Sequence, residues 1–424
     1  PKETPKVTTK VYENLTHNSV TLVGEVNSEG TSSVTEQGFY YIEEGTSTEI
    51  KVIFSTNGIG IYKADLSQLK PNTTYQYYAY AKNSIGVSES INKHAFITQK
   101  DPRYSSENII LKTQAEVDDF AKREMISIGN LIIGEKSTKN DIKDISKLKT
   151  LETLSRLSIK NTQLLSLKGF ENLKIIGGDS LVVLDNDKLE IIDNLGNTEI
   201  SLRDVIIKNN KNLLKITSFG SKSSNILRLK IDNNASLTSI EGLKNIETIY
   251  DELNNPKYGD LSIRNNKSLI NLNGLQGLKK VKNIGIIRNE SLQDLEGLSS
   301  EIIEPENLKI LVTHNVNLSS INPLDNYTKN ITILGTYLIY DINRNIELSS
   351  FNFNDYLKNI DGINNIEVSE SITLNFLGID NLPKFPQLSQ LDFLQVYGNK
   401  SLLVIDGFEN LISQNNKILS FQDP

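Results

Sequence analysis

The 424-residue sequence contains no cysteine and no tryptophan, and it has only one methionine and three histidines. Without cysteine, disulfides and thiolate metal sites are excluded. The histidines His17, His94 and His314 are far apart in the chain, so a shared metal or nucleophile site is not expected. No phosphate-binding glycine loop, H-E-x-x-H or G-x-S-x-G motif occurs. We therefore expect no metal, no cofactor and no catalytic residues.

Long apolar runs and basic blocks are missing as well. Apolar residues make up 38% of the chain, and no run approaches the roughly 20 residues of a membrane-spanning helix. The net charge is −7, with lysines interspersed among acids, so nucleic acid and anionic membranes are poor partners. The sequence starts PKETPKV, without Met, which indicates a processed or trimmed start. A lipid-bearing cysteine upstream of Pro1 is compatible with such a start.

One sequence motif is repeated about ten times between Leu157 and Asn410. Two copies read LKIDNNASLTSIEGL and LSIRNNKSLINLNGL. Each copy has an Asn three residues before the first Leu of its second half, and successive copies are 23 to 32 residues apart. A period of this length predicts a solenoid. The anchoring residues are Asn161, Asn186, Asn210, Asn234, Asn266, Asn289, Asn315, Asn345 and Asn399, with a degenerate copy at Asn375.

Each repeat has a fixed apolar pattern. Apolar residues alternate five and three positions before the Asn, which predicts a half-buried strand. Further apolar residues follow three, six and nine positions after it, often with Gly at the eighth, where a turn is expected. Stacked coils bury one another's apolar sides. Counting an early coil at 129–135, we expect a mainly β solenoid of about eleven coils over 112–420.

The recurring Asn has two interpretations. Its side-chain amide can bond the backbone at a corner and its counterparts in adjacent coils. Alternatively, the amides could form a row that binds a ligand. Because the same residue recurs where no one site could reach all copies, we predict a structural ladder.

The N-terminal part differs from the repeats. We expect residues 1–6 to be a disordered tether and residues 7–99, which hold half of the 16 tyrosines, to form an antiparallel sandwich. The run LSQLKPNTTYQYYAYAKNSIG resembles the corner and following strand of a fibronectin type III domain, with Leu69, Pro71 and Tyr75 matching its tyrosine corner. The stretch before it is similar to a variant common in exported proteins of Bacteroidetes-type bacteria.

This resemblance also predicts which tyrosines face the core. If Tyr75 and Tyr77 point inward, Tyr78 and Tyr80 point outward, with Tyr40 as a neighbour. The tryptophan usual in such a core is missing, and we expect Phe39 or Tyr41 to replace it.

Residues 100–111 are expected to be a linker, since Pro102 and a Ser pair disfavour regular structure. In the following LKTQAEVDDFAKREM, Thr113 and Glu116 resemble a capping box. Val117 and Phe120 fall on one helical face. We predict a short helix that caps the solenoid's N-terminal end.

The run from this helix through GNLIIG into the repeats resembles the receptor L domain, over about 107–420. That family is a right-handed leucine-rich β-helix found in growth-factor receptors and bacterial surface proteins. This chain departs from it in lacking cysteine and in having more coils. The resemblance implies an exported protein, on the outer-membrane surface of a Gram-negative bacterium. It also implies a non-catalytic adhesion, binding or scaffold role toward a protein or glycan.

Two other functions stay open. Parallel β-helices also house polysaccharide lyases and hydrolases, which need convergent carboxylates with Lys or Arg on one face. Acidic pairs such as Asp185 and Asp187 occur, but no coil aligns several. The third possibility is a purely structural surface spacer.

The second half of the rod carries insertions at 251–260, 299–307 and 330–360. Insertions in repeat proteins project from corners and often form the binding face. Exposed tyrosine is enriched at recognition surfaces. The predicted ligand-binding residues are therefore Tyr258, Tyr337, Tyr340 and Tyr356. The alternative is that the insertions only cap the C-terminal end of the rod or pack on each other.

Overall fold

The computed structural model of the protein divides into two compact units, Pro1–Tyr104 and Ser105–Pro424. Each unit is described by itself. The structure describes the chain outside residues 1, 55–57, 136–140, 251–258, 299–301, 303–308, 314, 316, 321–331, 334–344, 355–367, 378, 383, 387, 398–401, 405, 411–417 and 423–424.

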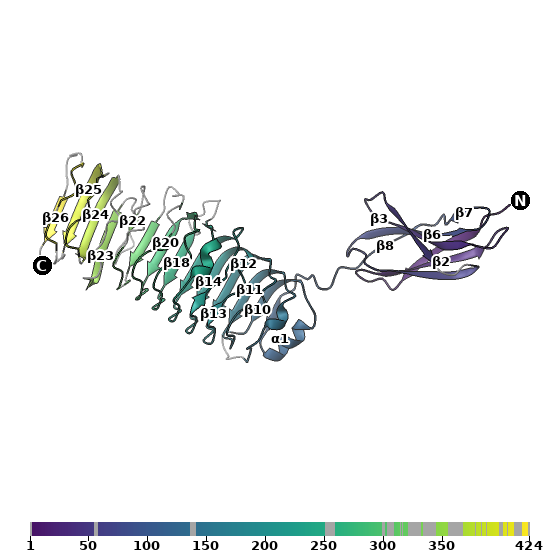
Figure 1. Ribbon diagram of the computed structural model, residues 1–424, viewed down its shortest axis with the longest axis horizontal. Coiled ribbons are helices and arrows are strands. Elements are labelled where there is room, and N and C mark those ends of the chain that lie inside the picture. The colour runs from purple at the N-terminus through teal and green to yellow at the C-terminus, as the bar shows by residue number, and fades with distance from the viewer. Residues whose placement is uncertain are drawn as a thin grey trace. The chain divides into compact units, whose positions relative to one another are not determined.

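The N-terminal unit consists of two antiparallel sheets (Figure 1). Its strands are β1 (Lys6–Glu13), β2 (Val20–Ser28), β3 (Glu36–Glu43), β4 (Glu49–Phe54), β5 (Gly60–Leu66), β6 (Thr74–Lys82), β7 (Val87–Glu89) and β8 (His94–Ile97). One sheet has the order β1-β2-β5. The other has the order β4-β3-β6-β7, and β8 also pairs with β6.

Aromatic and aliphatic side chains from both sheets form the core of this unit. Phe39 of β3 and Tyr62 of β5 lie with ring centroids 5.0 Å apart. Phe39 is fully buried, as are Leu22 and Tyr77, whereas Tyr41 is half-buried. Phe39 thus fills the central position between the sheets.

The segment expected to be a disordered tether is held to this unit from Glu3 onward. The backbone nitrogen of Thr31 and the side-chain amide of Asn83 both donate to the Glu3 carbonyl, at 3.0 and 3.1 Å. Pro5 is buried, and β1 already begins at Lys6. Backbone pairing, which composition does not reveal, orders these residues.

The C-terminal unit begins with β9 (Ile109–Leu111) and α1 (Gln114–Ala121). The Thr113 hydroxyl accepts a hydrogen bond from Glu116 N at 3.2 Å, and a Glu116 carboxylate oxygen accepts one from Lys112 N at 2.5 Å. Both bonds fix the start of the helix, although Glu116 accepts from the residue before the N-cap and not from Thr113 itself. Its buried face, Val117 and Phe120, joins the core of the rod.

Beyond α1 the described residues form a β-solenoid of about seven turns (Figure 1). Its main sheet is parallel, in chain order. The strands are β10 (Ser127–Ile133), β11 (Thr153–Lys160), β12 (Ile175–Leu184), β14 (Glu199–Lys208), β16 (Asn225–Asp232), β18 (Asp260–Arg264), β20 (Asn283–Ile287), β21 (Lys309–Thr313) and β22 (Thr332–Ile333), with β17 (Thr248–Ile249) and β19 (Lys280–Val281) alongside.

Shorter elements form the return side of the coils. They are η1 (Ser146–Leu148), β13 (Ile191–Ile192), β15 (Lys215–Ile216) and η2 (Glu241–Asn245). A further parallel sheet comprises β23 (Asn345–Asn354), β24 (Val368–Leu377), β25 (Gln390–Tyr397) and β26 (Ile418–Gln422). The described turns are fewer than the eleven coils expected, because several copies of the repeat lie partly outside the described ranges.

Repeat position determines which side chains are buried. In the coil anchored on Asn234, Leu229 and Ile231 before the Asn are fully buried. The apolar residues after it, Leu237 and Ile240, are fully buried too. The rod therefore has one continuous hydrophobic core. The outward strand positions carry polar residues and also apolar ones such as Val182 and Ile206.

Candidate recognition surfaces

The anchoring asparagines form a buried ladder. The side-chain amide of Asn210 donates to Oδ1 of Asn234 at 3.1 Å and to the Val183 carbonyl at 3.0 Å. The same Oδ1 atom accepts from Asn210 N at 3.0 Å. Equivalent bonds recur in the other coils, through the fully or almost fully buried Asn186, Asn210, Asn234, Asn266, Asn289 and Asn315. These amides bind the backbone and one another, so they stabilise the stack.

Asn161 does not occupy the ladder position in the first copy. Thr162 does, because its backbone nitrogen and hydroxyl donate to Asn186 Oδ1 at 3.0 and 2.8 Å. Leu157 pairs with Leu181, so this copy is shifted by one residue relative to the others. Asn161 instead has φ +54° and stands in a row of left-handed corner residues: Asp185, Asn209, Asn233, Asn265 and Arg288.

The later copies differ. Asn345 is the first residue of β23, so it begins a strand. Asn375 lies within β24. Asn399 lies outside the described residues.

The outward face of the main sheet carries charges of alternating sign. Asp204 on β14 pairs in register with Arg228 on β16, whose Nη2 atom donates to Asp204 Oδ2 at 2.8 Å. Lys208 Nζ lies 2.8 Å from Asp232 Oδ2 on the same two strands. Arg203 also contacts Asp179 on β12. Neighbouring coils thus neutralise one another over β12–β16.

Asp232 illustrates how these pairs act on titration. Partial burial alone would raise the pKa of its carboxyl. Hydrogen bonds from Lys208 and Asn265, with the charges of Lys208 and Arg264, outweigh burial and lower the pKa. The carboxylate is therefore ionised at neutral pH and stays paired.

Arg156 and Ser158 on β11 break this pattern. Arg156 Nε and Ser158 Oγ are buried and have no hydrogen-bond partner among the described residues. By strand alternation both point to the outward face, since Leu157 and Ile159 lie in the core. Arg156 is in register with Asn130 on β10, whereas Ser158 lies between Ile132 on β10 and Val182 on β12.

The strand beside these two residues is irregular. The register of β11 and β12 shifts between Leu154 and Leu157, where β12 contributes extra residues. At Gly178 an added Cβ would lie 2.4 Å from the Ser155 carbonyl oxygen, so only glycine allows this close approach. Bulges of this kind redirect side chains and are common beside functional sites. The region around Arg156 is the candidate recognition surface of the rod.

The outward tyrosines of the N-terminal unit are buried. Strand alternation holds, since Tyr40 packs on Tyr78 and Tyr80 on the face away from the core, with centroids 5.4 and 4.8 Å apart. Yet Tyr78 is only 5% exposed and Tyr80 is fully buried. Lysine stems cover them, with Lys93 Nζ 4.0 Å from the Tyr78 centroid and Lys51 Nζ 4.8 Å from that of Tyr80. These rings pack beneath charged side chains and are not an open binding face.

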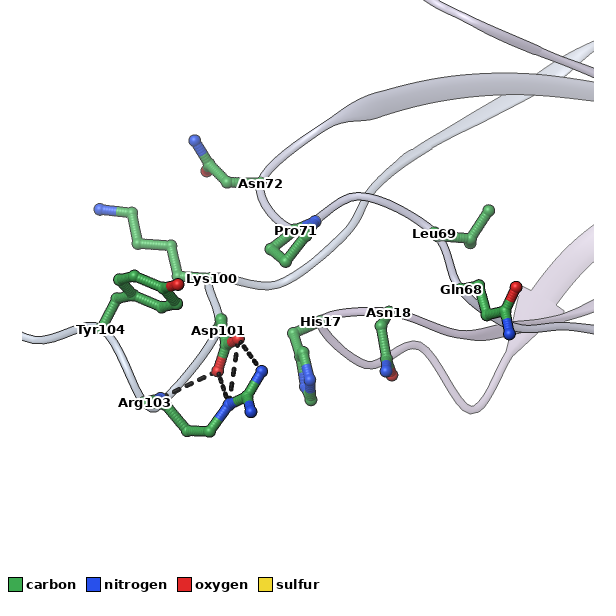
Figure 2. A pocket seen from close by; sticks show the side chains of 10 residues that line it. All are labelled: His17, Asn18, Gln68, Leu69, Pro71, Asn72, Lys100, Asp101, Arg103 and Tyr104. Carbon is green, nitrogen blue, oxygen red and sulfur yellow. Dashed lines mark hydrogen bonds and ion pairs between the residues drawn. The ribbon is translucent and has the colours of Figure 1, made fainter. Parts of the chain in front are cut away.

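The N-terminal unit also contains a pocket of about 610 Å³ (Figure 2). It lies where three segments meet: the loop before β2, the loop between β5 and β6, and the chain after β8. The lining residues are His17, Asn18, Gln68, Leu69, Pro71, Asn72, Lys100, Asp101, Arg103 and Tyr104. The sequence pattern gave no signal for this pocket, because its residues are up to 87 positions apart.

The predicted ligand-binding residues Tyr258, Tyr337, Tyr340 and Tyr356 lie outside the described residues. Within the described ranges, no group of three or more His, Asp or Glu side chains could hold a metal ion. No helix there has the length and apolar character needed to cross a membrane.

The fold defines the C-terminal unit as a β-solenoid. Residues 126–225, from the end of the α1 connection to the start of β16, match the family model described as Receptor L domain. No curated protein matches the chain.

Among solved structures, the chain is similar to the sensor domain of the anti-sigma factor RsgI4 in Pseudobacteroides cellulosolvens. A short form is 19% identical, with a TM-score of 0.20, over 23% of this chain and 98% of that chain. A long form is 18% identical, also with a TM-score of 0.20, over 25% of this chain and 99% of that chain.

Proposed function

We propose that this protein is an exported, non-catalytic binding protein whose rod recognises a protein or glycan through the outward face around Arg156. The observation that carries the proposal is the pair of buried polar atoms, Arg156 Nε and Ser158 Oγ, which have no hydrogen-bond partner among the described residues. On the same face Arg228 and Lys208 pair with Asp204 and Asp232. The Receptor L domain match at 126–225 includes this region.

The missing partner indicates the chemistry of the ligand. A buried donor without an acceptor costs about 1–3 kcal/mol. Arg228 has an acidic partner, because its Nε lies 2.7 Å from Asp204 Oδ1. Arg156 as a whole is half-buried, so the accessible part of its guanidinium could bind a carboxylate or sulfate of the ligand, groups that guanidinium recognises well. An acidic ligand is therefore the best fit.

The finer parts of the proposal concern architecture and location. The Tyr75 hydroxyl accepts from Lys70 N at 3.0 Å, which supports a fibronectin type III-like N-terminal unit with a tyrosine corner. We further propose that the repeats over 112–420 form eleven right-handed coils. The sequence resemblances support attachment to the outer-membrane surface of a Bacteroidetes-type bacterium, through a lipid anchor upstream of Pro1.

The test combines an array of neutral, sulfated and uronate-bearing glycans with a pull-down from host secretions. For an acidic ligand found this way, Arg156→Gln should weaken binding by about tenfold or more, equivalent to about 1.4 kcal/mol. Lys230→Gln removes an exposed charge from the same face of β16 and should leave binding unchanged. Undiminished binding by Arg156→Gln would contradict the proposed surface.

Two further experiments test the alternatives, which are catalysis and binding through the insertions. Incubation with polysaccharides should release no unsaturated or reducing-end products; products lost on mutating a rod carboxylate would establish an enzyme. A variant with Tyr258, Tyr337 and Tyr340 changed to Ala tests the insertions as a second contact surface. If the triple tyrosine variant lost binding while Arg156→Gln kept it, the binding site would lie on the insertions and not around Arg156.

A further inference from the structure

The pocket of the N-terminal unit is held open by its own backbone. Leu69 N donates to the Asn18 carbonyl at 2.9 Å, and Asn72 N donates to the Gln99 carbonyl at 3.1 Å. These bonds tie the three lining segments together. Gln68 and Asn72 have φ of +62° and +49°, left-handed conformations that the loop imposes at both ends of the Leu69–Pro71 wall. The pocket is therefore formed before any ligand arrives.

A neutral ion pair and one further cation set the charge of the pocket. Asp101, 6% exposed, accepts from Arg103 Nε at 3.1 Å and from Nη2 at 2.8 Å. Arg103 N donates to the same carboxylate at 2.9 Å. This pair is neutral overall. Lys100 is exposed and adds a positive charge, so the pocket favours a ligand with one anionic group.

The remaining side chains suit a polyhydroxylated ring. The amides of Asn18, Gln68 and Asn72 each offer a donor and an acceptor, as sugar hydroxyls do. Pro71 and Tyr104, the latter 56% exposed, also line the pocket (Figure 2) and offer apolar ring surface for the C–H face of a sugar. A volume of about 610 Å³ lies within the range of small-ligand sites.

We propose that this pocket binds an acidic sugar, a hexuronate residue alone or at the end of a glycan. Lys100 pairs with the carboxylate of the sugar, the amides bind its hydroxyls, and Tyr104 packs against its ring. The site goes beyond the function proposed for the rod, because all ten lining residues belong to the N-terminal unit.

Calorimetric titration of the full chain tests this site with three probes: the disaccharide of galacturonate, the neutral galactose disaccharide, and acetate. The galacturonate disaccharide should bind, and the neutral sugar should bind at least about tenfold more weakly. Lys100→Gln should weaken galacturonate binding by a similar factor, and Tyr104→Ala should weaken the binding of both sugars. Both positions are exposed, so the fold should be retained, as circular dichroism can verify.

Two controls make the result specific. Lys82→Gln removes the same charge at the other end of β6, about 26 Å from Thr74 at a strand rise of about 3.3 Å per residue, and should have no effect. Arg156→Gln changes only the surface proposed on the rod, so it should leave galacturonate binding to the N-terminal pocket unchanged. The absence of galacturonate binding, wild-type affinity in Lys100→Gln, or acetate binding as tight as the disaccharide would each overturn the proposal.

Discussion

Nδ2 of Asn210 lies 3.1 Å from Oδ1 of Asn234, one coil further along the rod. The same nitrogen donates to the Val183 carbonyl, in the coil before. One side-chain amide thus ties three successive coils together, and the relationship repeats from Asn186 to Asn315. Removing one amide should therefore disturb more than its own coil.

Asn266→Ala should lower the free energy of unfolding of the rod by about 1–3 kcal/mol, because it leaves the Ile231 carbonyl and the amide of Asn234 without their buried partner. Asn197→Ala at an exposed position should change it by less than about 0.5 kcal/mol. Urea unfolding followed by circular dichroism measures both. Equal effects would mean that the ladder does not stabilise the stack.

Leu213 and Leu214 are consecutive residues with opposite surroundings. Leu213 is fully buried, and Leu213→Ala should cost about 2–5 kcal/mol through the cavity it leaves. Leu214 is 44% exposed, and Leu214→Ala should cost less than about 0.5 kcal/mol. The same unfolding assay applies. A larger loss of stability in Leu214→Ala than in Leu213→Ala would contradict the assignment of Leu213 to the core.

Gly274 occupies a corner that other residues cannot adopt without strain. Its φ is +120°, and an added Cβ would lie 2.1 Å from the Ile240 carbonyl oxygen. Gly274→Ala should therefore destabilise the rod by more than about 1 kcal/mol. At Gly285 the nearest atom to an added Cβ is 3.8 Å away, so Gly285→Ala should be close to neutral. Thermal unfolding of the two variants should separate them clearly.

Asp101 should make the N-terminal unit less stable in acid. Hydrogen bonds from Arg103 hold the pKa of Asp101 below its usual range. Its stabilising contribution is complete above the unfolded-state pKa of about 3.9 and is lost as pH falls through the lower folded-state pKa. Asp101→Asn should remove this part of the acid dependence. Tyrosine fluorescence can follow unfolding from neutral to acid pH, since the chain has no tryptophan; identical pH profiles would refute the assignment.

Four tyrosines of this unit should resist ionisation in alkali. Burial raises the pKa of Tyr62, Tyr77, Tyr78 and Tyr80, and hydrogen bonds to Glu49 and Glu36 raise it further for Tyr78 and Tyr80. Stability from a raised phenol pKa is complete below the unfolded value of about 10 and is lost as pH rises through the folded value. Their ultraviolet ionisation should therefore coincide with loss of circular dichroism. Ionisation of all tyrosines before unfolding would contradict their burial.

Local pattern made much of the rod predictable. The alternation around residues such as Leu229 and Ile231, and the apolar spacing after each Asn, depend only on neighbours in the chain. The same holds for the capping box at Thr113 and Glu116. The alternation of Tyr77 and Tyr78 across β6 was also readable, but the burial of Tyr78 beneath Lys93 was not. That burial depends on a side chain from another part of the chain.

By itself the sequence determined a repeating, mainly β solenoid with an asparagine at each corner, because strand alternation and repeat period are local properties. Tertiary structure decided which residue fills each role. Register placed Thr162 in the ladder in place of Asn161, since strand pairing aligns whole coils. Among the described residues, strand pairing also left Arg156 Nε without a hydrogen-bond partner, while Arg228 gained Asp204. His17 and Asp101 come to line one pocket only when distant segments fold together.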